Sequence, residues 1–127
     1  MDKKSLQKAK NTGRLGEEYA AGHLVASGYT ILGTNFHSRF GEIDIIAKYE
    51  DEVIFCEVKT RRNLAYGLPQ EAFNHKKYSR IKKTIYEFFR TASKNADVKI
   101  TKWRIDLIAI LINSFDEVED LVHYKGV

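Results

Sequence analysis

Two carboxylates and an amine stand at positions where a buried strand would otherwise carry apolar residues. Asp44 ends the run Gly41–Asp44, and Glu57 and Lys59 flank a valine farther along the chain. Hard divalent cations such as Mg²⁺ prefer carboxylate oxygens, and a substrate phosphate commonly completes their coordination. A lysine beside such a site can stabilise negative charge that develops on the phosphate. These residue types predict a divalent-metal site that acts on a phosphodiester.

The spacing also predicts how these side chains meet. Residues 53–60 alternate as a strand does, so Glu57 and Lys59 project from the same face. If residues 42–48 pair with this strand as a hairpin, the carboxylates of Asp44 and Glu57 converge on one cation. The carbonyl of Val58 is then a candidate for a further ligand. The expected cation is Mg²⁺ or Mn²⁺, which would lower the pKa of a bound water and polarise a phosphate.

A purely structural explanation of the same residues stays open. An ion pair between Glu57 and Lys59 on an exposed strand would be common and would contribute little to stability. The apolar residues around the charges, including Ile43, Ile45 and Phe55, instead favour a central strand. A charge on such a strand is costly unless it is paired or used. We therefore prefer the functional interpretation.

Apolar periodicity predicts the elements that must position this site. The chain begins with a flexible basic arm, and the order is helix, three strands, helix, then one or two strands. We expect a single α/β domain with a mixed central sheet and helices on one of its faces. The expected segments are an arm at 1–8, a helix at 10–27, strands at 29–36, 42–48 and 53–60, a helix from Gln70 or Asn74 to Thr91, and strands at 99–112 and 121–124.

Composition excludes several classes of protein. A chain of 127 residues is long enough to bury the core of one domain without disulfides. Its single cysteine, Cys56, excludes an intramolecular disulfide framework, and we expect a small core residue in a reducing, cytoplasmic setting. No apolar stretch is long enough for a signal peptide or a membrane span, so we expect no membrane partner. The four histidines lack the spacing of a zinc site.

The net charge of +4 is modest, but the basic residues are clustered along the chain. Separated basic clusters can follow a phosphate backbone. They can equally keep a protein soluble, and charge alone does not choose between these explanations. Asp106 and Arg104, on the same strand, are expected to form a structural ion pair rather than part of the catalytic site.

Beyond these local patterns, most of the chain resembles a known family. Asp44 with Glu57-Val58-Lys59 resembles the PD-(D/E)XK nuclease motif, although Ile43 stands where the motif has proline. The chain from about Asn11 to Tyr124 resembles the YraN family of small bacterial endonuclease-like proteins, which is similar to archaeal Holliday-junction resolvases. The matching segments are Gly13–Ala20, Arg39–Ala47, Phe55–Arg61, Gly67–Ala72 and Arg104–Asp106.

The resemblance implies a restriction-endonuclease-like fold with the core order α-β-β-β-α-β. It implies that Asp44 and Glu57 bind the metal, that Lys59 is catalytic, and that Glu17 on the first helix completes the site. Without the resemblance, the expected role of Glu17 would be that of an ordinary solvent-exposed helix residue. Where the family often has an aromatic residue and an arginine after Asn35, this chain has Phe36 and His37.

These observations together predict a metal-dependent DNA endonuclease, acting on branched or flapped structures in recombination or repair. The alternative is a non-catalytic nucleic-acid-binding or interaction module on the same fold. A homodimer would suit a four-way junction, because such a junction has two-fold symmetry. The residues expected along the DNA backbone are basic, namely Arg39, Arg61, Arg62, Lys76, Lys77 and Arg80.

Overall fold

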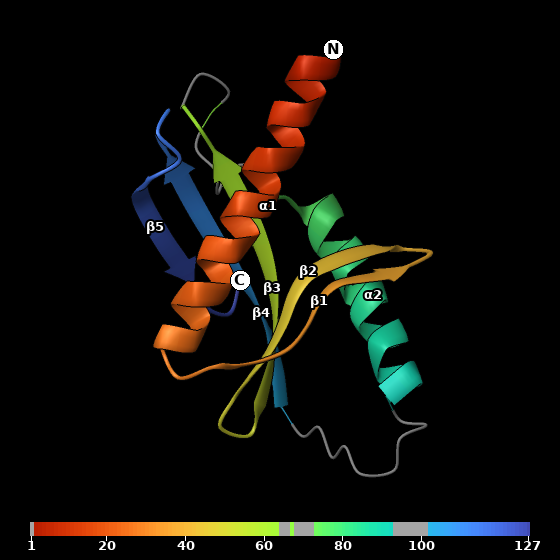
Figure 1. Ribbon diagram of the computed structural model, residues 1–127. Helices are drawn as coiled ribbons and strands as arrows, with labels where there is room; N and C mark the ends of the chain where they lie inside the picture. The colour runs from red at the N-terminus through yellow and green to blue at the C-terminus, as the bar shows by residue number, and fades with distance from the viewer. Residues whose placement is uncertain (1, 64–66, 68–72, 93–101) are drawn as a thin grey trace.

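Five strands form one sheet, and their order in space follows their order in the chain (Figure 1). The structure, a computed structural model, describes residues 2–63, 67, 73–92 and 102–127. Its elements are α1 (Lys3–Ala26), β1 (Thr30–Ser38), β2 (Gly41–Tyr49), β3 (Glu52–Arg61), α2 (His75–Ala92), β4 (Lys102–Ile112) and β5 (Val118–Tyr124).

The sheet is mixed, as expected. β1, β2 and β3 form an antiparallel meander, and β5 pairs with β4 in the same antiparallel manner. β3 and β4 are parallel, with Cys56 opposite Asp106, because the chain returns through α2 between them. This arrangement confirms the predicted α-β-β-β-α-β order and the restriction-endonuclease-like fold, to which β5 adds an edge strand.

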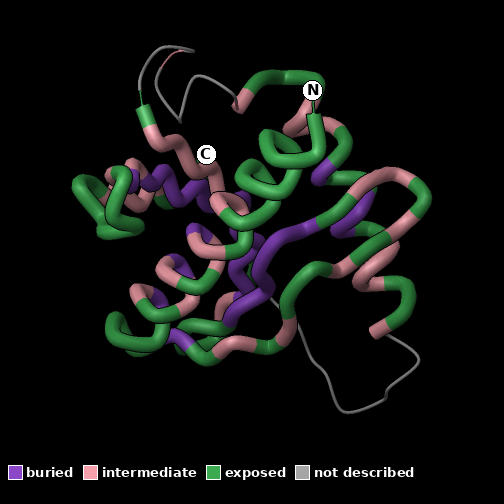
Figure 2. The backbone as a smooth tube through the Cα atoms, turned by 45° about the horizontal axis from the view of Figure 1, so that its top comes forward, coloured by how far each residue is buried: buried purple, intermediate pink, exposed green. Residues whose placement is uncertain are grey.

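The two helices pack on opposite faces of the sheet, so the prediction that both cover one face was wrong. Ala20 and Leu24 of α1 join one buried cluster with Ile54 and Cys56 of β3. Ile81 of α2 joins a second cluster with other residues of the strands, including Phe55. Alternate residues of β3 thus face different helices, and buried backbone runs along the central strands (Figure 2). Cys56 is a core residue, as predicted.

The helix ends differ from the expected boundaries. Asp2 caps α1, since its carboxylate accepts a hydrogen bond of 2.8 Å from the backbone N–H of Ser5. The helix therefore begins at Lys3, and residues 3–8, expected to form a flexible arm, are helical and extend beyond the sheet (Figure 1). Asn74 accepts from the N–H of Lys77 at 3.0 Å at the start of α2. The alternative start at Gln70 and the matching segment at 68–72 lie outside the described residues.

A close approach fixes α1 against the sheet. Gly16 is buried, and a Cβ atom at this position would lie 1.7 Å from Oγ1 of Thr60 on β3. Only glycine allows this separation between helix and strand. The contact places the next residue, Glu17, beside the middle strands of the sheet. Among the described helices, none has the length and apolar character that a membrane span requires.

Candidate metal and phosphodiester site

The site begins where β2 and β3 separate. Their backbone pairing ends at Ile45 and Cys56, and beyond it the N–H of Val58 donates to Oδ2 of Asp44 at 2.8 Å. The Asp44 carboxylate thus accepts the hydrogen bond that a backbone carbonyl of β2 would accept if the pairing of the two strands continued. Asp44 is 9% exposed and Glu57 is 7% exposed. The structure therefore places both predicted metal ligands at one buried fork in the sheet.

Three carboxylates meet at this fork. Glu17 of α1 and Glu42 and Asp44 of β2 each offer an oxygen, and these oxygens lie within 4.8 Å of one another. We call these three residues the carboxylate cluster. The resemblance implied Glu17, whereas no role was assigned to Glu42. The alternation of β2 carries a usable signal, because residues 42 and 44 share a face of a regular strand.

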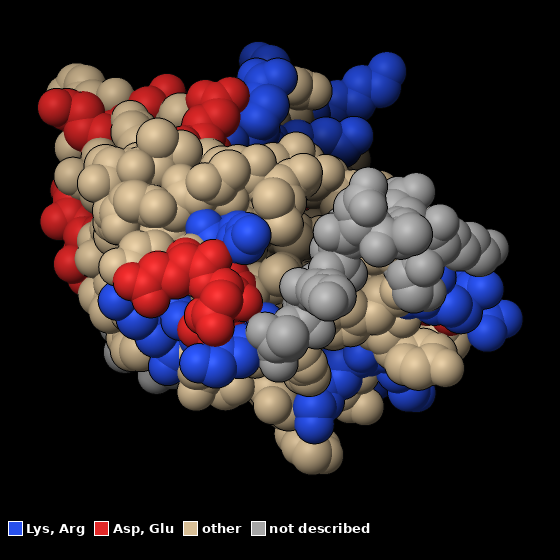
Figure 3. Space-filling view, turned by 90° about the horizontal axis from the view of Figure 1, so that it is seen from below, with Lys and Arg blue, Asp and Glu red and all other residues tan. Residues whose placement is uncertain are grey.

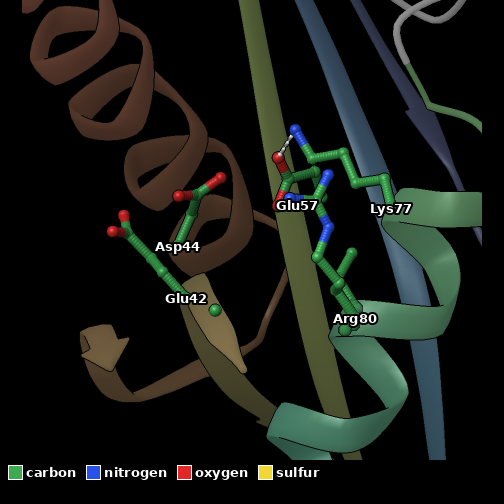
Figure 4. Close-up of a pocket in the computed structure, with 7 residues that line it drawn as sticks. Glu42, Asp44, Glu57, Lys77 and Arg80 are labelled. Atoms are coloured by element: carbon green, nitrogen blue, oxygen red, sulfur yellow. Dashed lines mark ion pairs between the residues drawn. The ribbon is translucent and has the colours of Figure 1, made fainter. Parts of the chain in front are cut away.

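Glu57 lies beside the cluster but pairs with a lysine from α2. Lys77 Nζ forms an ion pair with Glu57 Oε1, and Lys77 and Arg80 reach the site from the same helix (Figure 4). A cavity of about 310 Å³, here called the acidic cavity, is lined by Gly41, Glu42, Asp44, Glu57, Lys77, Arg80 and Ile81. Lys77 was predicted to contact DNA, and its pairing with Glu57 was missed.

Lys59 is half-buried and lines a neighbouring groove together with Glu17. Burial is the main cause that lowers the pKa of its ammonium group, and Lys77 and Arg61 lower it further, while Glu57 opposes them. No ion pair between Lys59 and Glu57 occurs among the described residues, so the simple surface pair considered from the sequence is not what the structure contains.

The electrostatics of the cluster favour a cation. Burial and then the charge of Glu57 raise the pKa of Asp44 to about 8, although the Val58 N–H lowers it. Burial also raises the pKa of Glu17. A hydrogen bond with Asn35 lowers this pKa, and the charges of Glu42 and Glu57 raise it further. The neighbouring carboxylates thus make ionisation of Asp44 and Glu17 more costly, and a bound cation would reduce that cost.

The residues expected along DNA fall into different environments. On the face shown in Figure 3, lysine and arginine side chains lie in several separate patches and not in one continuous band. The Arg62 guanidinium donates to Thr12 Oγ1 at 2.7 Å and forms an ion pair with Asp116 at 2.6 Å. It therefore links α1 to the turn between β4 and β5. Arg61 lines the groove beside Lys59, and Arg80 lines the acidic cavity. Lys76 is exposed on α2, and the Arg39 guanidinium lies 4.8 Å from the centre of the Phe40 ring.

The structure gives Asp106 a structural role, as expected. Its carboxylate accepts from Arg104 at 2.9 Å, from the backbone N–H of Gly126 at 3.0 Å, and contacts His123 Nε2 at 2.6 Å. Burial raises its pKa, but the bonds from His123, Arg104 and Gly126 outweigh burial and lower the pKa overall. The pair of His123 with His23, at 3.1 Å, was not expected from the sequence.

Comparison with known proteins identifies the family of this chain. Residues 16–110 match the model of the uncharacterised protein family UPF0102. The chain belongs to this family. The match confirms the resemblance to the YraN family, because YraN and UPF0102 denote the same family. It spans Glu17, the fork between β2 and β3, and the start of α2.

Curated relatives extend over nearly the same length. A UPF0102 protein of Caldicellulosiruptor bescii is 44% identical over 86% of this chain and 89% of its own. A UPF0102 protein of Trichlorobacter lovleyi is 48% identical over 83% of this chain and 80% of its own. These names give a family and not a reaction, so the chemistry must be argued from the site.

Proposed function

We propose that this protein is an Mg²⁺- or Mn²⁺-dependent endonuclease that hydrolyses DNA phosphodiester bonds, at branched or flapped structures. The observation that carries the proposal is the convergence of Asp44, Glu17 and Glu42 beside Glu57, at a fork between two otherwise apolar strands. Buried carboxylates are seldom left without a charged partner unless they bind a cation or take part in chemistry. Lys59 also supports the proposal, because the charges of Glu57 and Asp44 act on its ammonium group.

The donor set fits a hard divalent cation. The candidate ligands are carboxylate oxygens, which Mg²⁺ and Mn²⁺ accept, and no cysteine or histidine belongs to the cluster of described residues. Asp44 and Glu57 would hold the cation, Glu17 and Glu42 would complete its negative surroundings, and the Val58 carbonyl is a further candidate. The bound cation would activate water and polarise a phosphate oxygen.

The protein's own cations supply the rest of the chemistry. The lowered pKa of Lys59 suits a group that orients water or passes a proton near the phosphate. Arg80 lines the acidic cavity and offers a planar set of donors for phosphate oxygens. The Val58 N–H holds Asp44 in place by its 2.8 Å hydrogen bond. These groups would bind, orient and neutralise the scissile phosphate.

The test is cleavage of plasmid, flap and four-way-junction DNA with Mg²⁺ or Mn²⁺. We expect Glu57→Ala and Lys59→Ala to reduce cleavage by about 100-fold or more, as is usual for loss of an essential catalytic group. Glu18→Gln is the matched control, since Glu18 is exposed beside Glu17 on α1 and should retain full activity. Cleavage that survives both active-site substitutions would disprove the assignment.

One observation favours the alternative, a non-catalytic nucleic-acid-binding module. Lys77 neutralises Glu57 in this structure, as it would in a protein that binds no metal. That alternative predicts salt-dependent DNA binding with no cleavage under any divalent metal, and no heat of Mn²⁺ binding. The cleavage assay and a Mn²⁺ titration therefore separate the two functions.

A further inference from the structure

A second cavity, of about 500 Å³, lies between the first half of α1 and the end of β3. Lys8, Ala9 and Gly13 line it from the helix, and residues 58–63 line it from the strand side. We call it the α1–β3 groove. One end is formed by Glu17 and Val58, which also belong to the candidate metal site. The groove therefore leads directly to the carboxylate cluster.

The groove carries three cationic side chains, Lys8, Lys59 and Arg61, that form no ion pair with the residues the structure describes. Lys8 is exposed, Lys59 is half-buried, and Nε of Arg61 is buried without a hydrogen-bond partner among the described residues. Arg62 also lines the groove, but its guanidinium is bound to Thr12 and Asp116. The acid among the described lining residues, Glu17, stands at the end next to the metal site. A polyanion would therefore meet cations along the groove before it reaches the carboxylates.

The shape of the groove limits what can enter. Its volume is that of a small-molecule cleft, so it can receive a short stretch of one strand, whereas a duplex would have to lie across its mouth. Ala9 has a small side chain and Gly13 has none, so a strand of nucleic acid can approach the backbone of α1 closely. None of the described lining residues is aromatic, which leaves no platform for base stacking.

We propose that the α1–β3 groove binds the phosphate backbone of a single strand of nucleic acid and guides it to the carboxylate cluster. The proposal takes its ligand class from the proposed nuclease function. Recognition is through phosphates, so binding depends on salt and tolerates many sequences. A flap or the unpaired arm of a branched structure provides such a strand, whereas an intact duplex does not.

Filling the groove tests the proposal. A Cβ at Gly13 would have no neighbour within 4 Å, so Gly13→Leu should fold and place a side chain in the groove. Gly22→Leu is the matched control, since Gly22 is equally open on the same helix but does not line the groove. The measurement is fluorescence anisotropy of a labelled single strand in EDTA. We expect Gly13→Leu to weaken binding by about tenfold or more, as loss of phosphate contacts would, and Gly22→Leu to bind as wild type does.

Charge gives an independent measurement. Lys8→Gln should make the slope of log K against log salt shallower by about 0.7, the value for one phosphate contact to a single strand. Lys10→Gln is the control, because Lys10 is exposed on the same turns of α1 and is not among the groove-lining residues. Equal slopes for wild type and Lys8→Gln, or an equal change in both variants, would overturn the proposal.

The outcomes distinguish this inference from the proposed function. If Gly13→Leu loses single-strand binding and the wild type cleaves nothing, the groove stands and the nuclease function fails. If the wild type cleaves flaps and Gly13→Leu cleaves them with unchanged KM and binds the strand equally well, the nuclease function stands and the groove is wrong. Gly13→Leu should also melt no lower than the wild type, which excludes unfolding as the cause of lost binding.

Discussion

At the scale of single residues, the carboxyl group of Asp44 lies in surroundings that oppose its negative charge. It is buried at the fork between β2 and β3, near Glu57, Glu17 and Glu42, and its pKa is raised to about 8. One hydrogen bond, from the Val58 N–H, favours its charged form. Ionisation of Asp44 therefore lowers the stability of the fold, and such a cost is common at functional sites.

The first prediction concerns pH. Between about pH 4 and pH 8 the folded protein keeps the Asp44 proton that the unfolded chain has lost, so stability falls as pH rises through this window. Asp44→Asn cannot ionise and should be more stable than wild type by on the order of 1–3 kcal/mol at pH 8, with the difference closing toward pH 4. Urea unfolding in EDTA measures this. A wild type more stable than the variant at pH 8 would contradict the raised pKa.

The second prediction concerns the ion pair of Lys77 with Glu57. If a metal ion must displace the Lys77 ammonium, then Lys77→Gln should bind Mn²⁺ more tightly, by about fivefold for an ion pair worth about 1 kcal/mol. Calorimetric titration of wild type and variant checks this. Lys76→Gln is the control, because Lys76 is exposed beside it. Weaker Mn²⁺ binding by Lys77→Gln would mean that Lys77 supports the metal instead of competing with it.

The sequence was informative about residues on the strands and less so about the helix that approaches them. Alternation along residues 53–60 predicted a metal-binding role for Glu57, and the structure places its carboxylate beside Asp44, at the fork between β2 and β3. Lys77 is about twenty positions away, and nothing in local periodicity indicates that α2 brings its ammonium to Glu57. Glu42 could have been found from the face it shares with Asp44, but only once β2 was known to be regular there.

At the scale of elements, the position of α1 depends on one glycine. Gly16 lets the helix lie so close to β3 that any Cβ would collide with the Thr60 side chain, at 1.7 Å from its Oγ1 and 2.8 Å from its Cβ. Glu17 follows directly, and its carboxylate joins those of Glu42 and Asp44 in the carboxylate cluster. The packing of this helix and the completeness of the site are therefore set by the same contact.

The third prediction tests that contact. Gly16→Ala forces α1 away from β3 and should destabilise the protein by about 1–3 kcal/mol, the usual cost of overpacking, while also weakening Mn²⁺ binding through Glu17. Gly22→Ala, on the open face of the same helix, should be stabilising by up to about 1 kcal/mol. Thermal unfolding and Mn²⁺ titration measure both.

A partial rescue separates this explanation from a general loss of helix stability. Thr60→Ala in the Gly16→Ala background removes Oγ1 but leaves the Cβ, so it should restore part of the lost stability. If the double variant is no more stable than Gly16→Ala, the collision with Thr60 is not the cause of the loss.

At the scale of the whole molecule, a partly buried polar network links segments that flank the sheet to its middle strands. Arg104 binds Glu52 at 2.7 Å and the Tyr29 hydroxyl at 2.8 Å, in addition to Asp106. Asp106 in turn binds the N–H of Gly126 near the C-terminus. The network links β3 and β4 to Tyr29, just before β1, and to Gly126, just after β5. It lies on the side of the sheet that faces α1, where Tyr29 is part of the buried cluster.

The fourth prediction separates this network from the site. Asp106→Asn removes one charge of a buried pair and should cost about 3–5 kcal/mol in urea unfolding, with Mn²⁺ affinity unchanged in the folded protein. Asp51→Asn is the control, because its pair with Lys102 is exposed at 3.8 Å and should contribute less than about 1 kcal/mol. A stable Asp106→Asn variant that binds no metal would instead make Asp106 part of the site.

The fold itself was largely predictable, because strand alternation and turn residues specify a meander locally. The side on which each helix packs was not. The residues of β3 are apolar on both faces, so the sequence indicates a strand buried on both sides but does not indicate which helix covers each face. In the structure Cys56 faces α1 and Phe55 faces α2. The start of α1 was also misplaced, because residues 3–8 contain a single apolar side chain, that of Leu6, and so show no apolar stripe. The Asp2 cap was overlooked as well.

The parallel pairing of β3 with β4 has a consequence for how the chain reaches this fold. The β1–β2–β3 meander can form from neighbouring segments, but the pairing of Glu52 with Lys102 must close a loop that contains α2. Contacts between such distant segments slow folding. We therefore expect the rate-limiting step of folding to be the docking of β4 on β3. All four carboxylates of the site precede that step in the chain, so a nascent chain would carry an acidic, half-covered meander until β4 arrives.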